Sequence, residues 1–236
     1  MNALVVVPTY NERENLPVLA RGVLGLPGFR MLVVDDGSPD GTGDVADALA
    51  REYPGRVEVM HRTGKRGLGR SYIDGLRHAL ANTDAELICQ MDADLSHNPE
   101  HLPALTAAAA NADVVIGSRY LNGVSVVNWP LHRIVLSAFA NRYIRAVTQL
   151  SPSDCTSGFR CWRRAALARL PLDAMVSDGY AFLVEMLYNA KQLGLRIGEV
   201  PIIFIERRQG QSKLSSGVLL ESLVMPWRLV FRGSGS

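Results

Sequence analysis

The stretch Leu87-Ile88-Cys89-Gln90-Met91-Asp92-Ala93-Asp94 places two carboxylates directly after a mostly apolar run. A short apolar run that ends in polar turn residues is typical of a buried strand. Asp92 and Asp94 are two residues apart, so both side chains can leave the strand end on the same side. The sequence therefore predicts a strand over 87–91 that presents a carboxylate pair at its carboxyl end.

Three more polar motifs follow apolar runs in the same way. PTYNE at 8–12 follows the run 3–7, DDGSPDGT at 35–42 follows 31–34, and SRY at 118–120 follows 114–117. Helical patterns separate these runs, and this alternation predicts an α/β fold whose mostly parallel sheet has helices on both faces. Ligands of such sheets bind beyond the carboxyl ends of the strands. The four motifs therefore predict one shared binding site.

The rest of the chain continues the same pattern. Further strands are expected over 57–61 and 197–204, and helices over 12–24 with Asn11 as the cap, 43–52, 68–81, 99–110, 130–150, 180–193 and 217–231. The helices at 130–150 and 217–231 are amphipathic. With 236 residues, 47% of them hydrophobic, the chain supports one core. We expect a single domain over 1–232 and regard 233–236, Gly-Ser-Gly-Ser, as a linker or cloning tail.

Composition narrows the function classes. The net charge of +2 gives no reason to expect a nucleic-acid partner, whereas the chain from Arg207 onward carries five basic residues and one acidic residue. That tail suits an anionic membrane surface or a phosphate ligand, and a solvated surface is the simpler alternative. The three cysteines lack a C-x-x-C spacing, which disfavours a disulfide framework or a zinc site. Neither a signal peptide nor a membrane-spanning run is expected.

Asp92 and Asp94 are candidate metal ligands. Two neighbouring carboxylates repel each other, and a divalent cation between them offsets that repulsion. Oxygen ligands with room for diphosphate oxygens favour Mg²⁺ or Mn²⁺. An exposed polar turn is the alternative for a D-x-D pair taken alone. The candidate phosphate ligands are basic side chains, because guanidinium groups bind phosphate through two hydrogen bonds: Arg119, Arg133, Arg207, Arg208 and Lys213.

Taken together, these motifs resemble the inverting family 2 glycosyltransferases of GT-A fold, which have a Rossmann-like sheet. More closely, the chain resembles the polyprenol (dolichol) phosphate mannose synthases. The resemblance runs from residue 4 to about 213. The segments that carry it are PTYNERENL at 8–16, VVDDGSPDGT at 33–42, MDADLSH at 91–97, IGSRY at 116–120, NWP at 128–130, SGF at 157–159, VPI at 200–202 and QSKL at 211–214.

The resemblance implies a role for each matching position. The nucleoside would be held by Pro8, Tyr10, Asn11, Glu12 and Asp36, and the metal, with the donor diphosphate, by Asp92 and Asp94. Arg119 and Arg133 would hold an acceptor phosphate, and Arg207 and Lys213 would lie near the donor diphosphate. The implied catalytic set is Asp94, Arg119, Arg133 and Arg207. Ser96 stands where many relatives have Gln as a third metal ligand, and its hydroxyl is a weaker ligand.

The implied reaction is the transfer of mannose from GDP-mannose to a polyprenyl phosphate with inversion. Because a lipid phosphate is already anionic, it needs no general base. The missing ED and QxxRW motifs of processive synthases argue against polymer synthesis. The alternatives are a UDP-glucose or other nucleotide-sugar donor, and a nucleotide-binding module without catalysis. We expect peripheral attachment to the cytoplasmic face of a membrane, where the amphipathic helices would rest; core or dimer packing is the alternative for them.

Overall fold

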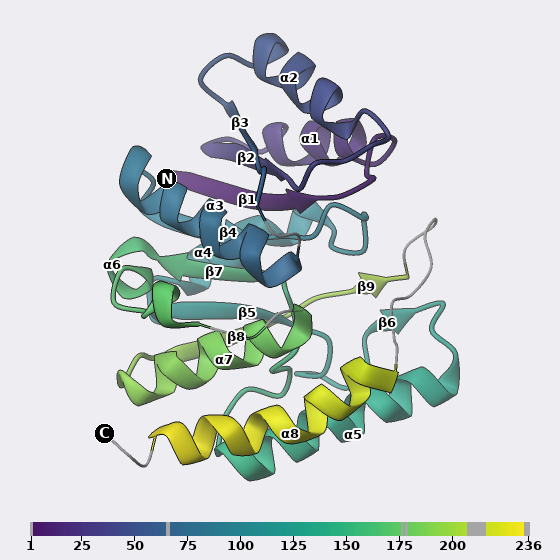
Figure 1. Cartoon of the computed structure of the whole chain (residues 1–236), viewed down its shortest axis with the longest axis vertical. Helices are drawn as coiled ribbons and strands as arrows, with labels where there is room; N and C mark the ends of the chain where they lie inside the picture. Colours follow the sequence, from purple (N-terminus) through teal and green to yellow (C-terminus); the bar gives the residue numbers. More distant parts are fainter. Residues whose placement is uncertain (1, 65–66, 176, 178, 207–215, 234–236) are drawn as a thin grey trace.

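The computed structural model of the chain describes residues 2–64, 67–175, 177, 179–206 and 216–233. Its centre is a seven-stranded sheet with the strand order β3-β2-β1-β4-β7-β5-β8 (Figure 1). The strands of this sheet are β1 (Ala3–Thr9), β2 (Phe29–Asp35), β3 (Val57–His61), β4 (Leu87–Gln90), β5 (Val114–Ser118), β7 (Arg160–Arg163) and β8 (Ile197–Pro201). A separate pair joins β6 (Val126–Val127) to β9 (Phe204–Ile205).

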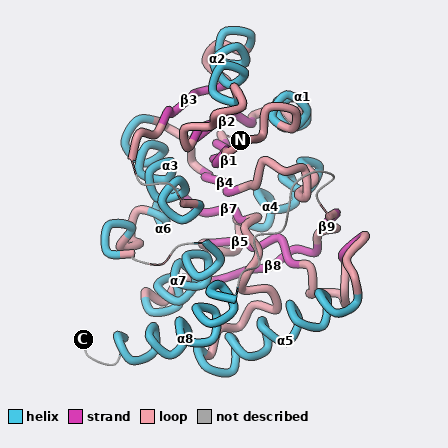
Figure 2. Tube along the Cα trace, turned by 45° about the vertical axis from the view of Figure 1, so that its right-hand side comes forward, coloured by secondary structure: helices cyan, strands magenta, loops and turns pink. Residues whose placement is uncertain are grey.

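Helices cover both faces of the sheet (Figures 1 and 2). One core cluster joins the sheet to α3 (Leu68–Asn82), α6 (Arg164–Leu167) and α7 (Gly179–Gln192), and the other joins it to α1 (Leu16–Leu24), α2 (Thr42–Glu52) and α4 (Leu102–Ala108). Two short 3₁₀ turns, Pro99–His101 and Leu172–Ala174, complete these connections. The predicted α/β fold with a mostly parallel sheet is confirmed.

Strand β7 is the feature that the sequence did not predict. It lies antiparallel between β4 and β5, whereas β1, β2, β3 and β4 pair in parallel with one another and β5 pairs in parallel with β8. Its four residues, Arg160-Cys161-Trp162-Arg163, begin and end with a charge, so they lack the apolar run of a central strand. The structure buries Arg160 completely, and this burial explains why the pattern misleads.

Two predicted boundaries were wrong. Asn11 does not cap the first helix, which begins at Leu16 with Asn15 at its N-cap. Asn11 has a left-handed backbone, and its N–H donates to the Ser38 hydroxyl, so residues 11–15 form a turn that is held against the next loop. The expected strand 197–204 is divided, because the N–H of Ile203 donates to the His101 ring and the chain leaves the sheet there.

Helices α5 (Leu131–Thr148) and α8 (Ser216–Gly233) lie side by side beyond the β8 edge of the sheet (Figures 1 and 2). The two helices expected over 130–150 and 217–231 are confirmed, and α8 runs one residue into the expected tail. The Tyr143 hydroxyl joins them by donating to the Leu223 carbonyl oxygen and accepting from the Trp227 ring N–H. In the part of the chain that the structure describes, no helix is long and apolar enough to cross a bilayer.

Candidate active site

The loops after β1 and β2 are bound to each other at the carboxyl edge of the sheet. The Thr9 hydroxyl donates to Asp35, whose carboxylate also accepts from the backbone N–H and the hydroxyl of Ser38. The N–H of Glu12 donates to the Thr42 hydroxyl at 2.9 Å. Asp35 therefore holds the backbone of its own loop, as aspartate commonly does in turns.

Asp36 turns toward a different set of partners. Its carboxylate is buried, accepts from Arg62 in an ion pair, and accepts from the N–H of Gly67 at 2.9 Å. Pro8 is buried in β1, and Tyr10 is half-buried just beyond it. The structure thus brings the five residues expected to hold a nucleoside to neighbouring strand ends. Their nucleoside role stays a prediction.

The carboxylate pair stands at the end of β4. Asp92 accepts a hydrogen bond of 2.9 Å from the Tyr72 hydroxyl, which is completely buried. Asp94 accepts from both the N–H and the hydroxyl of Ser96, at 3.1 and 2.5 Å. Burial and the nearby Asp92 charge both raise the pKa of Tyr72 well above its ordinary value, so this phenol stays a donor. These hydrogen bonds fix the orientation of each carboxylate group.

The donor chemistry of the pair fits Mg²⁺ or Mn²⁺. Magnesium in enzymes is commonly held by one or two carboxylates together with substrate phosphates, so a complete protein cage is not required. Among the described residues, no three carboxylate, imidazole or thiol groups converge on one point. A Cβ at Gly158 would lie 3.4 Å from both Asp92 carboxylate oxygens, so glycine keeps that side clear. The role of Ser96 as a third ligand remains a prediction, and its observed contact is with Asp94.

His97 connects the carboxylate pair to the rest of the site. The N–H of Asp92 donates to Nδ1 of His97, which must therefore carry its own proton on Nε2. Burial lowers the pKa of His97, although the Asp92 and Asp94 carboxylates oppose the shift. The neutral ring stacks on Phe159 at 4.9 Å and meets Phe204 edge-on at 5.4 Å. This histidine is a positioning group for the β4 loop.

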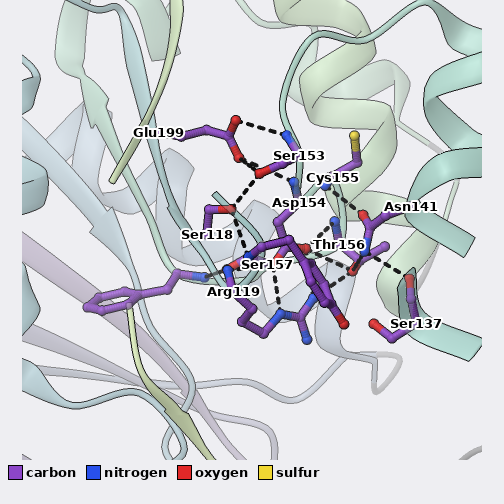
Figure 3. Close-up of polar contacts among 12 residues, drawn as sticks. Ser118, Arg119, Ser137, Asn141, Ser153, Asp154, Cys155, Thr156, Ser157 and Glu199 are labelled. Carbon is purple, nitrogen blue, oxygen red and sulfur yellow. Dashed lines mark hydrogen bonds and ion pairs between the residues drawn. The ribbon is translucent and has the colours of Figure 1, made fainter. Parts of the chain in front are cut away.

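Arg119, directly after β5, forms a buried ion pair with Asp154 (Figure 3). Two side-chain nitrogens donate to the two carboxylate oxygens at 2.6 and 2.7 Å, and the backbone N–H of Arg119 adds a third bond at 3.1 Å. The guanidinium also donates to the Thr156 hydroxyl. Burial alone would raise the pKa of Asp154, but the Arg119 charge and the hydrogen bonds from Arg119 and Thr156 together hold that pKa below its ordinary value. The pair is therefore ionised at neutral pH.

The segment 153–158 that carries Asp154 is anchored on three sides (Figure 3). Glu199 of β8 accepts from the N–H and hydroxyl of Ser153, and Asn141 of α5 accepts from the N–H of Cys155. Arg160, completely buried, donates to the carbonyl oxygens of Cys155, Ser157 and Leu183. Sequence reasoning assigned no role to Asp154. The polar run SPSDCTSG at 151–158, directly after a helical pattern, was the signal that marked this loop.

Arg133 and Arg119 meet at one aromatic ring. The Arg133 guanidinium carbon lies 4.1 Å from the centroid of the Trp129 ring, and that of Arg119 lies 5.5 Å from the same centroid. Arg133 also forms an ion pair with Glu206. The structure therefore brings together the two arginines expected to hold an acceptor phosphate. Arg207 and Lys213, with Arg208, lie outside the described residues, so their predicted roles rest on the sequence alone.

The overall architecture matches solved structures along nearly the whole chain. Glucosyl-3-phosphoglycerate synthase from Mycobacterium tuberculosis, in complex with Mn²⁺, uridine diphosphate and glucosyl-3-phosphoglycerate, gives a TM-score of 0.71 at 18% identity and covers 99% of this chain and 80% of its own. The same enzyme with Mn²⁺, uridine diphosphate and phosphoglyceric acid gives 0.68 at 18% identity, over 99% of this chain and 78% of its own. The fold is therefore that of a GT-A glycosyltransferase.

The amino-acid sequence gives the finer placement. The sequence pattern of glycosyl transferase family 2 matches residues 4–170, and the chain belongs to that family. The undecaprenyl-phosphate mannosyltransferase of Micrococcus luteus is 46% identical over 238 residues, which cover 100% of this chain and 97% of that protein. The polyprenol monophosphomannose synthase of Mycolicibacterium smegmatis is 47% identical over 222 residues, 93% of this chain and 83% of that protein.

Proposed function

We propose that the chain transfers mannose from GDP-mannose to the phosphate of a polyprenyl monophosphate, with inversion at the anomeric carbon. The observation that carries the proposal is that a carboxylate pair, Asp92 and Asp94, is linked through the rings of His97 and Phe204 to the arginine pair around Trp129. The likeness along the whole chain to proteins named as polyprenyl-phosphate mannosyltransferases supports the choice of sugar and acceptor.

Each part of the site has one task in this proposal. Asp92 and Asp94 would hold Mg²⁺ or Mn²⁺, which supplies positive charge to the donor diphosphate as it leaves. Arg119 and Arg133 would hold the acceptor phosphate. The nucleoside would lie against the loops after β1 and β2, and Arg207 and Lys213 would lie near the diphosphate.

The chemistry requires little proton transfer. An oxygen of the acceptor phosphate attacks the anomeric carbon, the bond from that carbon to the donor diphosphate breaks, and GDP leaves. Because the attacking phosphate oxygen is already anionic at neutral pH, no base has to remove a proton from it. His97 would not be used as a base, since its Nδ1 is occupied by the Asp92 N–H. Holding two anionic groups together is then the main task of the site.

The lipid part of the acceptor would lie in a membrane against α5 and α8. Exposed apolar side chains recur at every fourth position on each helix, with Leu131 74% and Phe139 61% exposed on α5, and Trp227 48% and Phe231 71% exposed on α8. Such stripes rest in the boundary between headgroups and acyl chains, where tryptophan is enriched. The enzyme would thus work as a peripheral protein on the cytoplasmic face of a membrane.

Transfer of radiolabelled sugar into an organic-extractable lipid tests the proposed reaction. GDP-mannose, UDP-glucose and UDP-N-acetylglucosamine are supplied in separate reactions with polyprenyl phosphate and Mn²⁺, with and without EDTA. We expect label in lipid from GDP-mannose and its loss with EDTA or with Asp94→Ala. Label from a UDP-sugar alone would overturn the mannose assignment. Nucleotide binding without any labelled lipid would overturn the transfer reaction in favour of a binding module.

Flotation with anionic liposomes tests the membrane surface separately. Phe139→Asp should reduce the fraction of protein that floats, because it places a charge within the apolar stripe of α5. Val18→Asp is the matched control, since Val18 is an exposed apolar residue of α1 on the opposite part of the molecule (Figure 1). Equal flotation of both variants and the parent protein would contradict the assignment of this face.

A further inference from the structure

Trp129 occupies a central place among the basic groups of the site. Its ring lies within cation–π distance of both Arg119 and Arg133, and it packs edge-on against Phe204 at 5.4 Å. Arg119 is also 5.4 Å from the Phe204 ring and 5.6 Å from the Tyr120 ring. Aromatic faces attract guanidinium groups, so these rings hold two like charges near each other.

Two buried hydrogen-bond donors in this cluster have no acceptor among the described residues. The indole Nε1 of Trp129 and the hydroxyl of Tyr120 are buried atoms without a hydrogen-bond partner in the part of the chain that the structure describes. A buried polar group that lacks a partner costs free energy, so native proteins retain few of them. The rings that carry these donors have their centroids 5.6 Å and 5.5 Å from the guanidinium carbon of Arg119, which also pairs with Asp154. An anion held there would use them.

The cluster is tied to the carboxylate pair. The N–H of Ile205 donates to the carbonyl oxygen of Ser96, the residue that orients Asp94. Phe204 meets the ring of His97, which accepts from the N–H of Asp92. A ligand bound by the aromatic cluster therefore lies next to the loop expected to hold the metal and the donor diphosphate. That is the position an attacking phosphate needs.

We propose that Trp129 and Tyr120 are binding residues for the acceptor phosphate. The Trp129 Nε1–H and the Tyr120 O–H donate to phosphate oxygens, while the Trp129 ring keeps Arg119 and Arg133 close enough to share one dianion. This inference rests on the proposed function for the identity of the anion as an acceptor phosphate. The same groups would bind any phosphate monoester. The alternative ligand is the donor diphosphate, and the experiments below distinguish the two.

Calorimetric titration with farnesyl phosphate, a short soluble isoprenyl monophosphate, measures the binding without any transfer. Trp129→Phe keeps an aromatic ring and removes the N–H, and Tyr120→Phe removes only the hydroxyl. A hydrogen bond to a charged group is worth enough to weaken binding about tenfold to a hundredfold when it is lost. We expect that loss in each variant, and no binding of farnesol to any of them. Tyr53→Phe, remote from the cluster, is the matched control and should bind like the parent protein.

Kinetics then separate the two phosphate sources. We expect the KM for the lipid acceptor to rise in both variants while the KM for GDP-mannose stays unchanged. A rise in the KM for the donor alone would assign the cluster to the diphosphate and overturn the inference, as would unchanged farnesyl phosphate binding in variants that fold normally. If Trp129→Phe shows no thermal unfolding transition and is therefore not folded, the binding and kinetics of Tyr120→Phe test the inference by themselves. Farnesyl phosphate binding without mannose transfer by the parent protein would overturn the proposed function and leave this phosphate site standing.

Discussion

Replacing Asp154 with Asn removes the charge that balances Arg119. The Asp154 carboxylate is completely buried and accepts from the Arg119 side chain at 2.6 and 2.7 Å and from its backbone N–H at 3.1 Å. Asparagine has nearly the same shape, but its amide NH₂ cannot accept a hydrogen bond from the guanidinium. The substitution therefore leaves the buried positive charge of Arg119 next to the amide NH₂ group of the new side chain, which is itself a donor.

The size of the effect follows from burial. Breaking a buried ion pair by removing one partner costs about 3–5 kcal/mol. For a chain of this length each kcal/mol lowers the Tm by about 2–4 °C, so the Tm should fall by about 6–20 °C. An exposed pair is worth only about 0–1 kcal/mol. The Asp113–Arg196 pair, with Arg196 mostly exposed, supplies that comparison through Asp113→Asn.

The effect should also depend on pH. The folded-state pKa of Asp154 lies below the unfolded value of about 3.9. The ionised carboxylate therefore makes its full contribution to the free energy of unfolding above that value, and this contribution is lost as pH falls through the folded-state pKa. The parent protein and Asp154→Asn should thus differ most near neutral pH and approach each other below about pH 4.

Urea denaturation followed by circular dichroism at a series of pH values measures both effects. Asp154→Asn should be several kcal/mol less stable than Asp113→Asn at pH 7 if the burial argument holds. Equal stability of the two variants, or a difference that does not shrink in acid, would refute the reasoning that the Arg119–Asp154 pair is a tight buried charge pair.

Two more substitutions probe the support of the carboxylate pair and the packing of the sheet. Tyr72→Phe removes the hydroxyl that donates to Asp92 and should weaken the apparent Mn²⁺ affinity about tenfold or more, measured by transfer at varied Mn²⁺ and by calorimetry with GDP; unchanged affinity would contradict the proposed metal role of Asp92. Gly75→Ala would place a Cβ 2.7 Å from a Val6 methyl and should cost about 1–3 kcal/mol in urea denaturation. Gly64→Ala meets no atom within 4 Å and is the control, so equal losses in both would be inconsistent with overpacking as the cause.

The central parallel strands were predictable because each contains an apolar run, as over 3–7 in β1, 31–34 in β2 and 114–116 in β5. Both faces of β1 and β2 are covered by helices, so the buried part of each strand is a hydrophobic run that ends in a polar turn. Strand β7 does not follow this pattern, because it contains the buried Arg160, whose guanidinium donates to backbone carbonyl oxygens inside the core. A guanidinium buried in that way gives no local pattern in the sequence.

The location of the candidate site was predictable where its residues directly follow a strand. Asp92 and Asp94 follow one strand, and Arg119 follows another, so strand ends alone located them. The partners of these residues were not predictable, because they come from distant segments. Asp154 is 35 positions from Arg119, and Tyr72 is 20 positions from Asp92. Only the tertiary structure places such pairs in contact.

The place of β7 in the sheet constrains the order in which the chain can fold. Strands β1 to β4 are neighbours in one half of the sheet, but β4 and β5 do not pair, because β7, which comes later in the chain, lies between them. Until residue 163 is available, the edge of β4 presents unpaired N–H and carbonyl groups to other chains. We therefore expect a chain that ends before β7 to aggregate more readily than the complete chain.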